Sequence, residues 1–410
     1  MVLIGLAVRV LYIVASHSYH MNHEEWFSSE MAGLGYSLAT GRGFGSPFGG
    51  ETGPSAWTGP IYPWITSLAF RIFGPLSDGS AFALLTFNSV FCALTSWTIY
   101  RIARRLFDET VAVWSGWVWA LFPTVMFWSV TWIWETSLSA FLLSLLFLLT
   151  LEMEGDDRLS SWLGYGLLWG ILALTNTSGL AWLPFAGCWL AYQLHTRRKR
   201  FLVPVVASAV IFWATLMPWL VRDYKVFGKP IFIRGDLGVE LRSGNNDEAD
   251  GGYIASYNPD NKGKMYWQYK RMGEAAFVAE QGDIAKQWIA ANPERFAELT
   301  GLRVIYFWAG LPRTGFGQEA RNLLLLLSSL LAIGGLLLAI KQRVHAVFLL
   351  TSLMVFYPLI YYVTFPSARY RHAIEPELIV LAVYLIVAIC AGVRSRRRPA
   401  AEIQPVHSRA

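Results

Sequence analysis

The chain has 410 residues, of which 15% are charged and 54% belong to the hydrophobic set AVILMFWYC. Soluble domains carry about 25% charged residues, so this composition excludes an ordinary soluble domain and indicates a polytopic membrane protein. The formal net charge of +6 does not indicate nucleic-acid binding, because the Lys and Arg residues gather at the ends of apolar segments, which is the pattern that sets membrane topology. We therefore expect membrane lipids, and no nucleic acid, as partners.

Apolar segments, taken in chain order, predict about ten membrane-spanning helices of roughly 16–22 residues each. They are Val2–Ser16, Ser80–Tyr100, Glu109–Phe127, Trp132–Leu151, Trp162–Thr175, Leu180–Leu194, Phe201–Leu220, Asn322–Ile340, His345–Thr364 and Ala373–Val393. The chain then begins with a transmembrane module over 1–220, which includes a long first loop over 17–79. A mixed helical segment over 221–321 separates the seventh and eighth helices. C-terminal helices over 322–393 and a basic tail over 394–410 follow.

Four basic clusters lie on the same side of the membrane if this helix count holds. They follow the second, sixth, eighth and tenth predicted helices, at 101–105, 197–200, 341–343 and 394–398. Because positive residues favour the cytoplasmic side, the first loop, the 221–321 segment and the short link Ser367–His372 are expected to face outward. All the candidate chemistry then lies on the outer face.

The first loop carries three carboxylates near its start, Glu24, Glu25 and Glu30. Long loops of this kind are usually functional. Apolar residues recur at helical spacing between 24 and 40, which predicts an amphipathic helix lying in the membrane interface. Glu30 sits beside that apolar stripe and is the first candidate for a functional carboxylate, whereas a solvated polar face explains Glu24 and Glu25 equally well. The glycine-rich stretch Gly41–Gly50 predicts turns.

The link between the last two predicted helices carries Arg369, Arg371 and His372, followed by Glu375. Two arginines on an outward-facing link oppose the usual inward bias of positive charge. An anionic group such as a phosphate would compensate them, because guanidinium groups bind phosphate oxygens in a bidentate manner. The alternative is an internal ion pair between Arg371 and Glu375. Arg222, just after the seventh predicted helix, is a similar candidate, although binding of lipid headgroups explains it equally well.

Several chemistry-bearing motifs do not occur. The sequence has no Walker loop, no HExxH motif and no paired CxxC motif, so it assigns no residue to a metal and shows no recognisable nucleotide site. Any activated substrate is therefore expected to arrive from the membrane.

Several short motifs resemble the GT-C family of polytopic glycosyltransferases, which use polyprenyl-phosphate sugars. The chain is similar to protein mannosyltransferases and bacterial aminoarabinose transferases, and looks closest to a bacterial subgroup. The motifs are SLATGRGFGSPF with GPSAWTGPIYP, PWLVRDYKVFGK with IRGDLGVELRSGN, GEAAF with WIAANPERF, and RYRHAIEP, within Glu30–Pro63, Pro218–Asn245, Gly273–Phe296 and Arg369–Pro376. They span nearly the whole chain. The chain departs from the family at Glu24-Glu25, where an adjacent Asp-Glu pair is more usual.

The resemblance implies an enzyme that moves a sugar from a polyprenyl-phosphate donor to a hydroxyl of a glycan, lipid or protein acceptor. It implies a multi-pass protein of the bacterial inner membrane with its active site facing the periplasm or exterior. The implied catalytic carboxylate is Glu30, with Glu24 or Glu25 as alternatives. The residues implied to bind the donor phosphate are Arg369, Arg371 and Arg222. The residues implied to contact the substrate are His372, Tyr62 and Trp57. A single carboxylate opposite a phosphate leaving group favours inversion. Some relatives use a divalent metal such as Mg or Mn and others do not.

A transporter or lipid flippase for a polyprenyl-linked glycan is the alternative function. The break TNTSG at Thr175–Gly179 is typical of the broken helices of transporters, but the sequence contains no second copy of it. A non-catalytic lipid-binding protein would need the basic residues but not Glu30.

Overall fold

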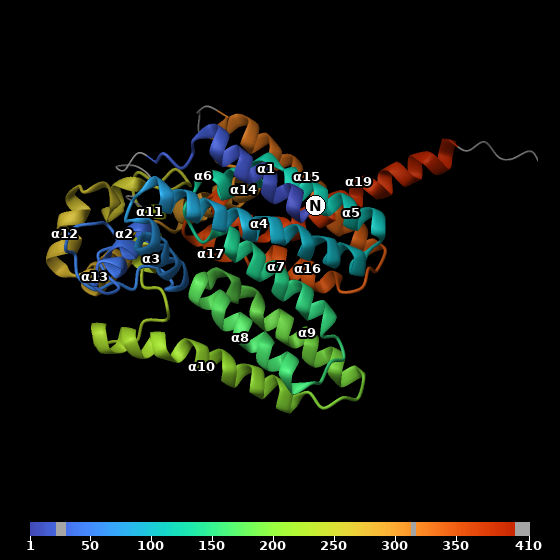
Figure 1. The fold of residues 1–410 in the computed structure, drawn as a ribbon, viewed down its shortest axis with the longest axis horizontal. Helices are drawn as coiled ribbons and strands as arrows, with labels where there is room; N and C mark the ends of the chain where they lie inside the picture. The colour runs from blue at the N-terminus through green and yellow to red at the C-terminus, as the bar shows by residue number, and fades with distance from the viewer. Residues whose placement is uncertain (22–29, 313–316, 398–410) are drawn as a thin grey trace, which may run out of the picture.

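The structure, a computed structural model, describes residues 1–21, 30–312 and 317–397. Within these ranges the chain forms helices and no strand, apart from one isolated β-bridge between Gly45 and Pro54. Figure 1 shows one helical body in which short helices gather at one end and long helices run away from it. The helical architecture predicted from the composition is therefore confirmed.

Apolar helices from both ends of the chain form the main bundle. They are α1 (Val2–Ser16), α4 (Asp78–Leu106), α5 (Glu109–Leu121), α6 (Pro123–Thr131), α7 (Thr136–Glu152), α15 (Gln318–Lys341), α16 (Val347–Phe356) and α19 (Glu375–Arg397). Helix α4 packs against α5 and α7, and α15 packs along α19. The last helices of the chain thus complete a bundle that the first ones begin.

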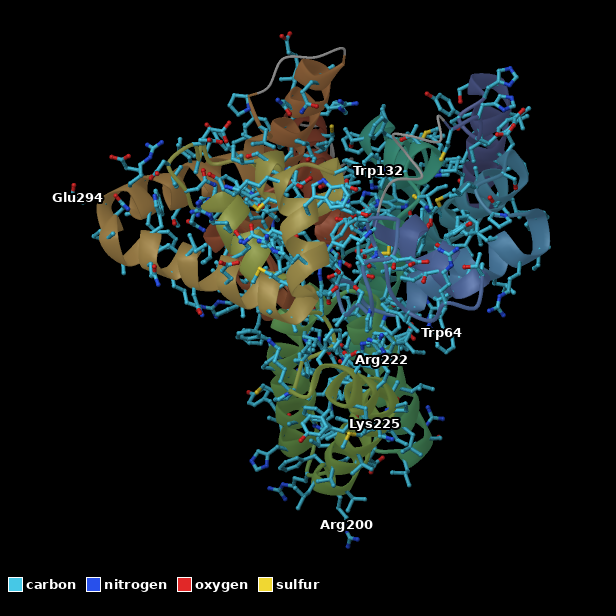
Figure 2. All side chains as sticks on the ribbon, turned by 90° about the vertical axis from the view of Figure 1, so that its left-hand side faces the viewer. Trp64, Trp132, Arg200, Arg222, Lys225 and Glu294 are labelled. Carbon is cyan, nitrogen blue, oxygen red and sulfur yellow. The ribbon has the colours of Figure 1, made fainter. Side chains whose placement is uncertain are left out.

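A second group of helices comes from the middle of the chain. It consists of α8 (Leu159–Thr175), the 3-10 helix η1 (Thr177–Trp182), α9 (Leu183–Thr196) and α10 (Leu202–Phe227). Helix α10 packs mainly on α8, and both extend away from the main bundle (Figure 1). Figure 2 shows Arg200, in the link between α9 and α10, at the far tip of this group.

Short helices from the first loop and from the segment before α15 gather at the opposite end (Figure 1). They are α2 (Glu30–Ala39), α3 (Ile61–Phe73), α11 (Leu237–Gly244), η2 (Ala255–Tyr257), η3 (Pro259–Asn261), α12 (Lys264–Met272), α13 (Glu274–Ala291) and α14 (Pro293–Ala309). The segment between α16 and α19 adds α17 (Leu359–Val363), α18 (Ala368–Arg371) and η4 (His372–Ile374). The motif-bearing parts of the sequence therefore meet in one region.

Among the described residues, four helical stretches are long and apolar enough to cross a membrane, namely α4, α10, α15 and Ala368–Gly392. The pair α5 and α6, bent by 46°, adds a fifth if it is one span. Each of the ten predicted spans overlaps a helix, but the count of ten stays a prediction. The third predicted span, Glu109–Phe127, is not one straight helix. Proline restricts the backbone of the residue before it, and Phe122, which precedes Pro123, is extended with φ −70° and ψ 121°.

The predicted interfacial helix is present as α2 from Glu30 onward, and residues 22–29 lie outside the described part. Helix α2 buries Met31 and Leu34. The glycine-rich stretch after it turns as predicted, and it folds back onto α2. A Cβ atom at Gly33 would lie 2.1 Å from the carbonyl oxygen of Pro47, so this close contact between α2 and the loop requires glycine.

Candidate active site

A cavity of about 530 Å³ lies where the first loop, α6, α11, α15 and the link before α18 meet. Ligand cavities of enzymes span roughly 300–1,000 Å³, so its size suits a sugar-sized group. Its charged lining residues are Glu30, Glu240, Asp260, Arg234, Arg321 and Arg369. Its aromatic lining residues are Trp57, Phe127, Trp128, Trp132, Trp134, Tyr253, Phe365 and Tyr370. Both charge signs and many aromatic faces therefore converge on one space.

Glu30 reaches the cavity from the first turn of α2. A carboxylate in the first turn of a helix is favoured by the positive end of the helix dipole. The side chain is half-buried, and its charge acts on two other groups in the cavity, Asp260 and Tyr253. Glu30 therefore lies at the cavity, and its role as the functional carboxylate stays a prediction.

Arg369 enters the cavity from α18 and stacks on aromatic rings. Its guanidinium carbon lies 4.3 Å from the ring centre of Trp134 and 5.9 Å from that of Trp132. Its Nη2 donates a hydrogen bond to the hydroxyl of Tyr370 at 3.3 Å. Within the described ranges Arg369 forms no salt bridge with a carboxylate. Cation–π contacts hold the group in place and leave most of its N–H donors available to a ligand.

A second cation, Arg234, is already paired. Its Nε donates to Oδ2 of Asp236 at 2.7 Å, and a second nitrogen lies 3.5 Å from Glu240. Burial disfavours the charged form of Arg234, but Asp236 and Glu240 outweigh burial and raise its pKa well above the usual value. Arg234 therefore serves to hold two carboxylates at the cavity wall.

Two cavity acids differ from ordinary surface carboxylates. Burial, with a further contribution from Asp236, raises the pKa of Glu240 to about 8, although Arg234 opposes the shift. Burial and then the charge of Glu30 raise the pKa of Asp260 to about 7. Near neutral pH both groups thus exist partly in the protonated form, which can donate hydrogen bonds.

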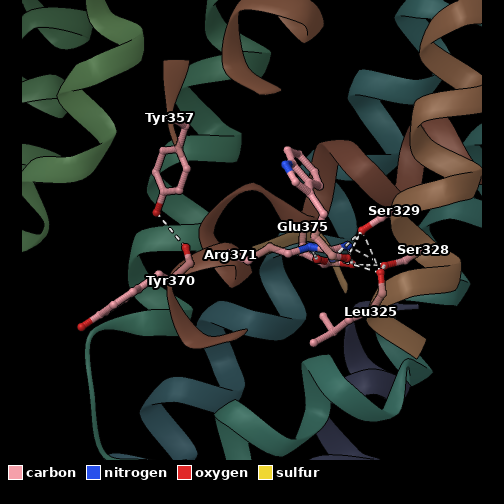
Figure 3. A network of polar contacts seen from close by, with 8 residues as sticks. Leu325, Ser328, Ser329, Tyr357, Tyr370, Arg371 and Glu375 are labelled. Atoms are coloured by element: carbon pink, nitrogen blue, oxygen red, sulfur yellow. Dashed lines mark hydrogen bonds and ion pairs between the residues drawn. The ribbon is translucent and has the colours of Figure 1, made fainter. Parts of the chain in front are cut away.

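Arg371, two residues from Arg369, lies outside the cavity. Its Nε forms an ion pair with Oε2 of Glu375 at 2.8 Å, and its other nitrogens donate to Ser328 at 2.6 Å and Ser329 at 2.7 Å (Figure 3). It also donates to the carbonyls of Trp308 and Leu325, at 3.0 Å each. The internal ion pair considered as the alternative has formed. Arg371 ties the start of α19 to α15, and its donors are occupied.

Arg222 also binds within the protein. Its nitrogens donate to the carbonyl oxygens of Ser55 at 2.6 Å and Phe44 at 2.8 Å, and pair with Asp223 at 2.7 Å. It is not part of the cavity lining. Because these carbonyls belong to the first loop, Arg222 fixes that loop to the end of α10.

The remaining predicted residues are distributed between core and cavity. Trp57 lines the cavity. Tyr62 is fully buried, and its hydroxyl donates to Asn88 at 3.1 Å. His372 is buried with its ring 5.4 Å from that of Trp119. Neither Tyr62 nor His372 lines the cavity, and the alternative carboxylates Glu24 and Glu25 lie outside the described residues.

The wall formed by Trp57 and Thr58 is fixed by a buried carboxylate. Glu274, at the start of α13, accepts hydrogen bonds from the Ser55 hydroxyl and the Ala56 N–H, both at 2.5 Å, and from the Tyr269 hydroxyl at 2.7 Å. Burial raises its pKa to about 7 despite these donors. The GEAAF motif that begins at Gly273 therefore joins α13 to the first loop.

The described residues offer no ligand set for a metal ion. No group of three or more His, Cys, Asp or Glu side chains is placed to hold one within these ranges. Protein sites for Mg or Mn rely on oxygen ligands, mainly carboxylates. A divalent metal such as Mg or Mn therefore stays a prediction, and the described residues assign none of its ligands.

The sequence analysis missed three charged residues of the cavity, Glu240, Asp260 and Arg321. Glu240 and Asp260 lie in a segment whose charges look like those of any soluble helix. For Arg321 a signal existed, because it is a basic residue at the outward-facing start of a predicted membrane helix. Like Arg369, it opposes the usual inward bias of positive charge.

Residues 57–221 match the profile of the dolichyl-phosphate-mannose-protein mannosyltransferase family. Among solved structures, the chain is similar to the archaeal oligosaccharyltransferase AglB from Archaeoglobus fulgidus, in complex with an inhibitory peptide and a dolichol-phosphate. The TM-score is 0.53 and the sequence identity 13%, over 97% of this chain and 51% of that one. The chain has the GT-C fold. A comparison with curated proteins finds no match.

Two further structures belong to the same comparison. The A. fulgidus oligosaccharyltransferase in complex with Zn and sulfate gives a TM-score of 0.53 and 13% identity, over 96% of this chain and 50% of that one. The GT-C chain thus spans about half the length of that enzyme. ArnT from Cupriavidus metallidurans bound to undecaprenyl phosphate is 14% identical over 96% and 79% of the two chains, with a TM-score of 0.41 that is too low to add to the assignment.

Proposed function

We propose that this GT-C protein moves a sugar from a polyprenyl-phosphate donor to an acceptor hydroxyl on the outer face of the bacterial inner membrane. The observation that carries the proposal is the meeting of Glu30 and Arg369 at one cavity. Such a transfer needs a carboxylate and a guanidinium, and these two come from opposite ends of the chain. Within the described residues the guanidinium forms no salt bridge with a carboxylate. The oligosaccharyltransferase of the same fold binds a dolichol-phosphate, which supports a lipid-phosphate donor.

In this reaction the acceptor oxygen forms a bond to the anomeric carbon while the bond from that carbon to the phosphate oxygen breaks. Glu30 takes the proton of the acceptor hydroxyl, and general-base catalysis of this kind contributes roughly 10²–10⁴-fold. The bonding electrons leave with the polyprenyl phosphate. Arg369 stabilises the charge that grows on the phosphate, by about 3–4 kcal/mol if it acts like one well-placed oxyanion donor.

The walls of the cavity suit a sugar between these two groups. Trp57 and Trp134 line the cavity, and sugars pack their apolar faces on aromatic rings. With Glu30 as base on one side and the phosphate at Arg369 on the other, a single displacement with inversion at the anomeric carbon is expected. Glycan, lipid and protein hydroxyls are all suitable acceptors for this chemistry.

The variant Glu30→Gln tests the role of the carboxylate. It keeps the size of the side chain but cannot accept the proton, so we expect sugar transfer to fall roughly 10²–10⁴-fold while donor binding changes little. The measurement is the consumption of a labelled polyprenyl-phosphate sugar by membranes that contain the protein, together with binding of the same lipid to the purified protein.

Glu51→Gln is the matched control, because Glu51 is an exposed carboxylate of the same loop and does not line the cavity. It should leave transfer unchanged. Undiminished transfer by Glu30→Gln would remove Glu30 as the base. A wild-type protein that binds a polyprenyl-phosphate sugar, never consumes it, and moves it across the bilayer would identify a flippase instead.

A further inference from the structure

One cation of the cavity, Arg321, has no role in the reaction described above. It lies in the first turn of α15 and is half-buried. Its guanidinium carbon is 4.7 Å from the ring centre of Phe127 in α6. Its Nη2 donates to Oε1 of Gln318 at 2.8 Å. All three side chains line the cavity.

The polar groups around Arg321 are already used by one another. Gln318 donates through Nε2 to Oδ1 of Asn322 at 2.9 Å, and Asn322 donates to the carbonyl of Leu311. In the described part of the chain Arg321 forms no ion pair, and one hydrogen bond occupies only a fraction of its N–H donors. The guanidinium is therefore the group at this wall that still has donors for a ligand.

The acidic groups of the cavity have other cations beside them. Glu240 pairs with Arg234, Glu30 interacts electrostatically with Arg369, and Asp260 interacts with Lys262. A cation beside an apolar membrane helix is costly unless an anion compensates it. The surroundings of Arg321 are thus those of a group that binds an anionic ligand.

Arg321 and Arg369 occupy separate positions along one segment of the cavity wall. Arg321 stacks on Phe127, whereas Arg369 stacks on Trp132 and Trp134. Phe127 lies within α6, whereas Trp132 and Trp134 follow the end of that helix at Thr131. Two separate anionic groups, rather than one phosphate shared between both arginines, fit these separate positions.

We propose that Arg321 forms a second anion subsite of the cavity, which binds a phosphate or carboxylate group beyond the donor phosphate at Arg369. The inference rests on the proposed function, because it takes the donor phosphate at Arg369 as the first anion. The second group comes either from a diphosphate-linked donor or from an anionic acceptor. In both cases the planar guanidinium, fixed on Phe127, presents its edge to the anion.

The first experiment tests the donor as the source. Full-length protein in nanodiscs of neutral phosphatidylcholine is titrated with undecaprenyl phosphate and with undecaprenyl diphosphate. If the second phosphate binds at Arg321, the wild-type protein prefers the diphosphate by about tenfold or more. Arg321→Gln then loses most of this preference and keeps its affinity for the monophosphate.

The second experiment tests the acceptor as the source. Inorganic phosphate is titrated onto the same protein after saturation with undecaprenyl phosphate, and binding is followed by phosphorus NMR. If the subsite belongs to the acceptor, the wild-type protein binds the two lipids equally and also binds inorganic phosphate. Arg321→Gln then binds the lipid but loses the inorganic phosphate.

Two variants separate the subsite from a general effect of charge. Arg321→Lys keeps the positive charge but lacks the planar guanidinium with its paired N–H donors, so it should recover only part of the lost binding. Lys341→Gln removes a positive charge at the other end of α15 and should change neither titration. These controls also report whether the variant proteins fold, because both must still bind undecaprenyl phosphate.

The inference is overturned if Arg321→Gln matches the wild-type protein in both titrations. It is also overturned if the variant differs only in nanodiscs of anionic lipid, because Arg321 would then hold a bilayer headgroup. Failure of the wild-type protein to bind either undecaprenyl lipid would instead contradict the proposed function, so the two failures are distinguishable.

Discussion

Arg369 and Arg371 stand two residues apart and have opposite surroundings. In the short helix α18 (Ala368–Arg371), side chains at this spacing point in different directions. Arg369 reaches aromatic rings at the cavity, whereas Arg371 is fully buried against α15 and Glu375. Only the first of the two has donors left for a ligand. A phosphate site at this link thus depends on one arginine, with the second serving the packing of α15 and α19.

The raised pKa values of Glu240 and Asp260 predict that donor binding weakens as the pH rises. Their pKa values are about 8 and about 7, so both are mainly neutral at pH 6 and mainly ionised at pH 9. Ionisation adds negative charge to a cavity that binds an anion. We expect the Kd of a polyprenyl phosphodiester, whose own charge is constant over this range, to rise about tenfold.

The measurement is a titration of the purified protein at several pH values between 6 and 9. The double variant Glu240→Gln with Asp260→Asn cannot ionise at these positions and should show a nearly flat profile. An equally steep rise of the Kd in the double variant would mean that other groups cause the pH dependence.

Single residues of the site were predictable where their charge was out of place. Glu30 and Arg369 were found because charges are rare next to apolar helices and need a reason there. The same rule could not tell that Arg222 and Arg371 bind backbone and side-chain groups inside the protein, because a sequence shows that a charge needs a partner but not which one. Asp260 gave no such signal, since charges are ordinary in a polar segment.

At the scale of elements, hydropathy located the helices well and their breaks less well. The first predicted span coincides with α1 (Val2–Ser16), whose apolar run ends where the polar residues from His17 onward begin. Hydropathy does not register the turn at Phe122, where the chain stays apolar and Pro123 alone imposes the break. The packing of α11 and α17 against α14 was likewise not predictable, because it depends on contacts between distant segments.

Arg303 of α14 connects two elements of the cavity wall. Its guanidinium donates to the carbonyls of Gly244 at 2.5 Å, Val363 at 3.0 Å and Tyr362 at 3.2 Å. These carbonyls lie at the ends of α11, which carries Glu240, and of α17, which leads to Phe365. Carbonyls at helix ends lack partners within the helix, and here one buried arginine supplies them.

We expect Arg303→Ala to destabilise the protein by about 2–4 kcal/mol, because several buried carbonyls lose their donor. Donor affinity should fall as well, because α11 and the link before α18 are no longer held together. The measurements are the Tm of the purified protein and the Kd of the donor lipid, with Arg303→Lys restoring part of both.

Arg295→Ala is the matched control on the same helix, because Arg295 is largely exposed and pairs with Glu298 of its own helix at 2.9 Å. It should shift the Tm far less. If Arg303→Ala lowers the Tm but leaves the Kd of the donor unchanged, Arg303 stabilises the fold without positioning the cavity wall.

At the scale of the whole molecule, three links predicted to lie in the cytoplasm meet around one carboxylate. Glu154, after α7, lies 2.8 Å from Nε2 of His345 before α16 and 3.8 Å from Arg197 after α9. Lys199 pairs with Asp157 of the same link as Glu154, at 3.0 Å. Segments that touch through side chains at the membrane surface lie on one side of it. Helices α11, α12 and α13 lie at the other end of the long helices (Figure 1), and α11 carries the cavity residue Glu240.

This arrangement predicts the accessibility of two positions that lie far apart in Figure 2, Arg200 and Glu294. In a background without the native cysteines, Glu294→Cys should react with a membrane-impermeant maleimide in intact cells. Arg200→Cys should react only after the cells are permeabilised, because its basic cluster favours the cytoplasm. Labelling of both in intact cells would contradict the predicted topology. Labelling of Arg200→Cys alone would invert it and place Glu30 and Arg369 in the cytoplasm, where the transfer would have to use acceptors made inside the cell.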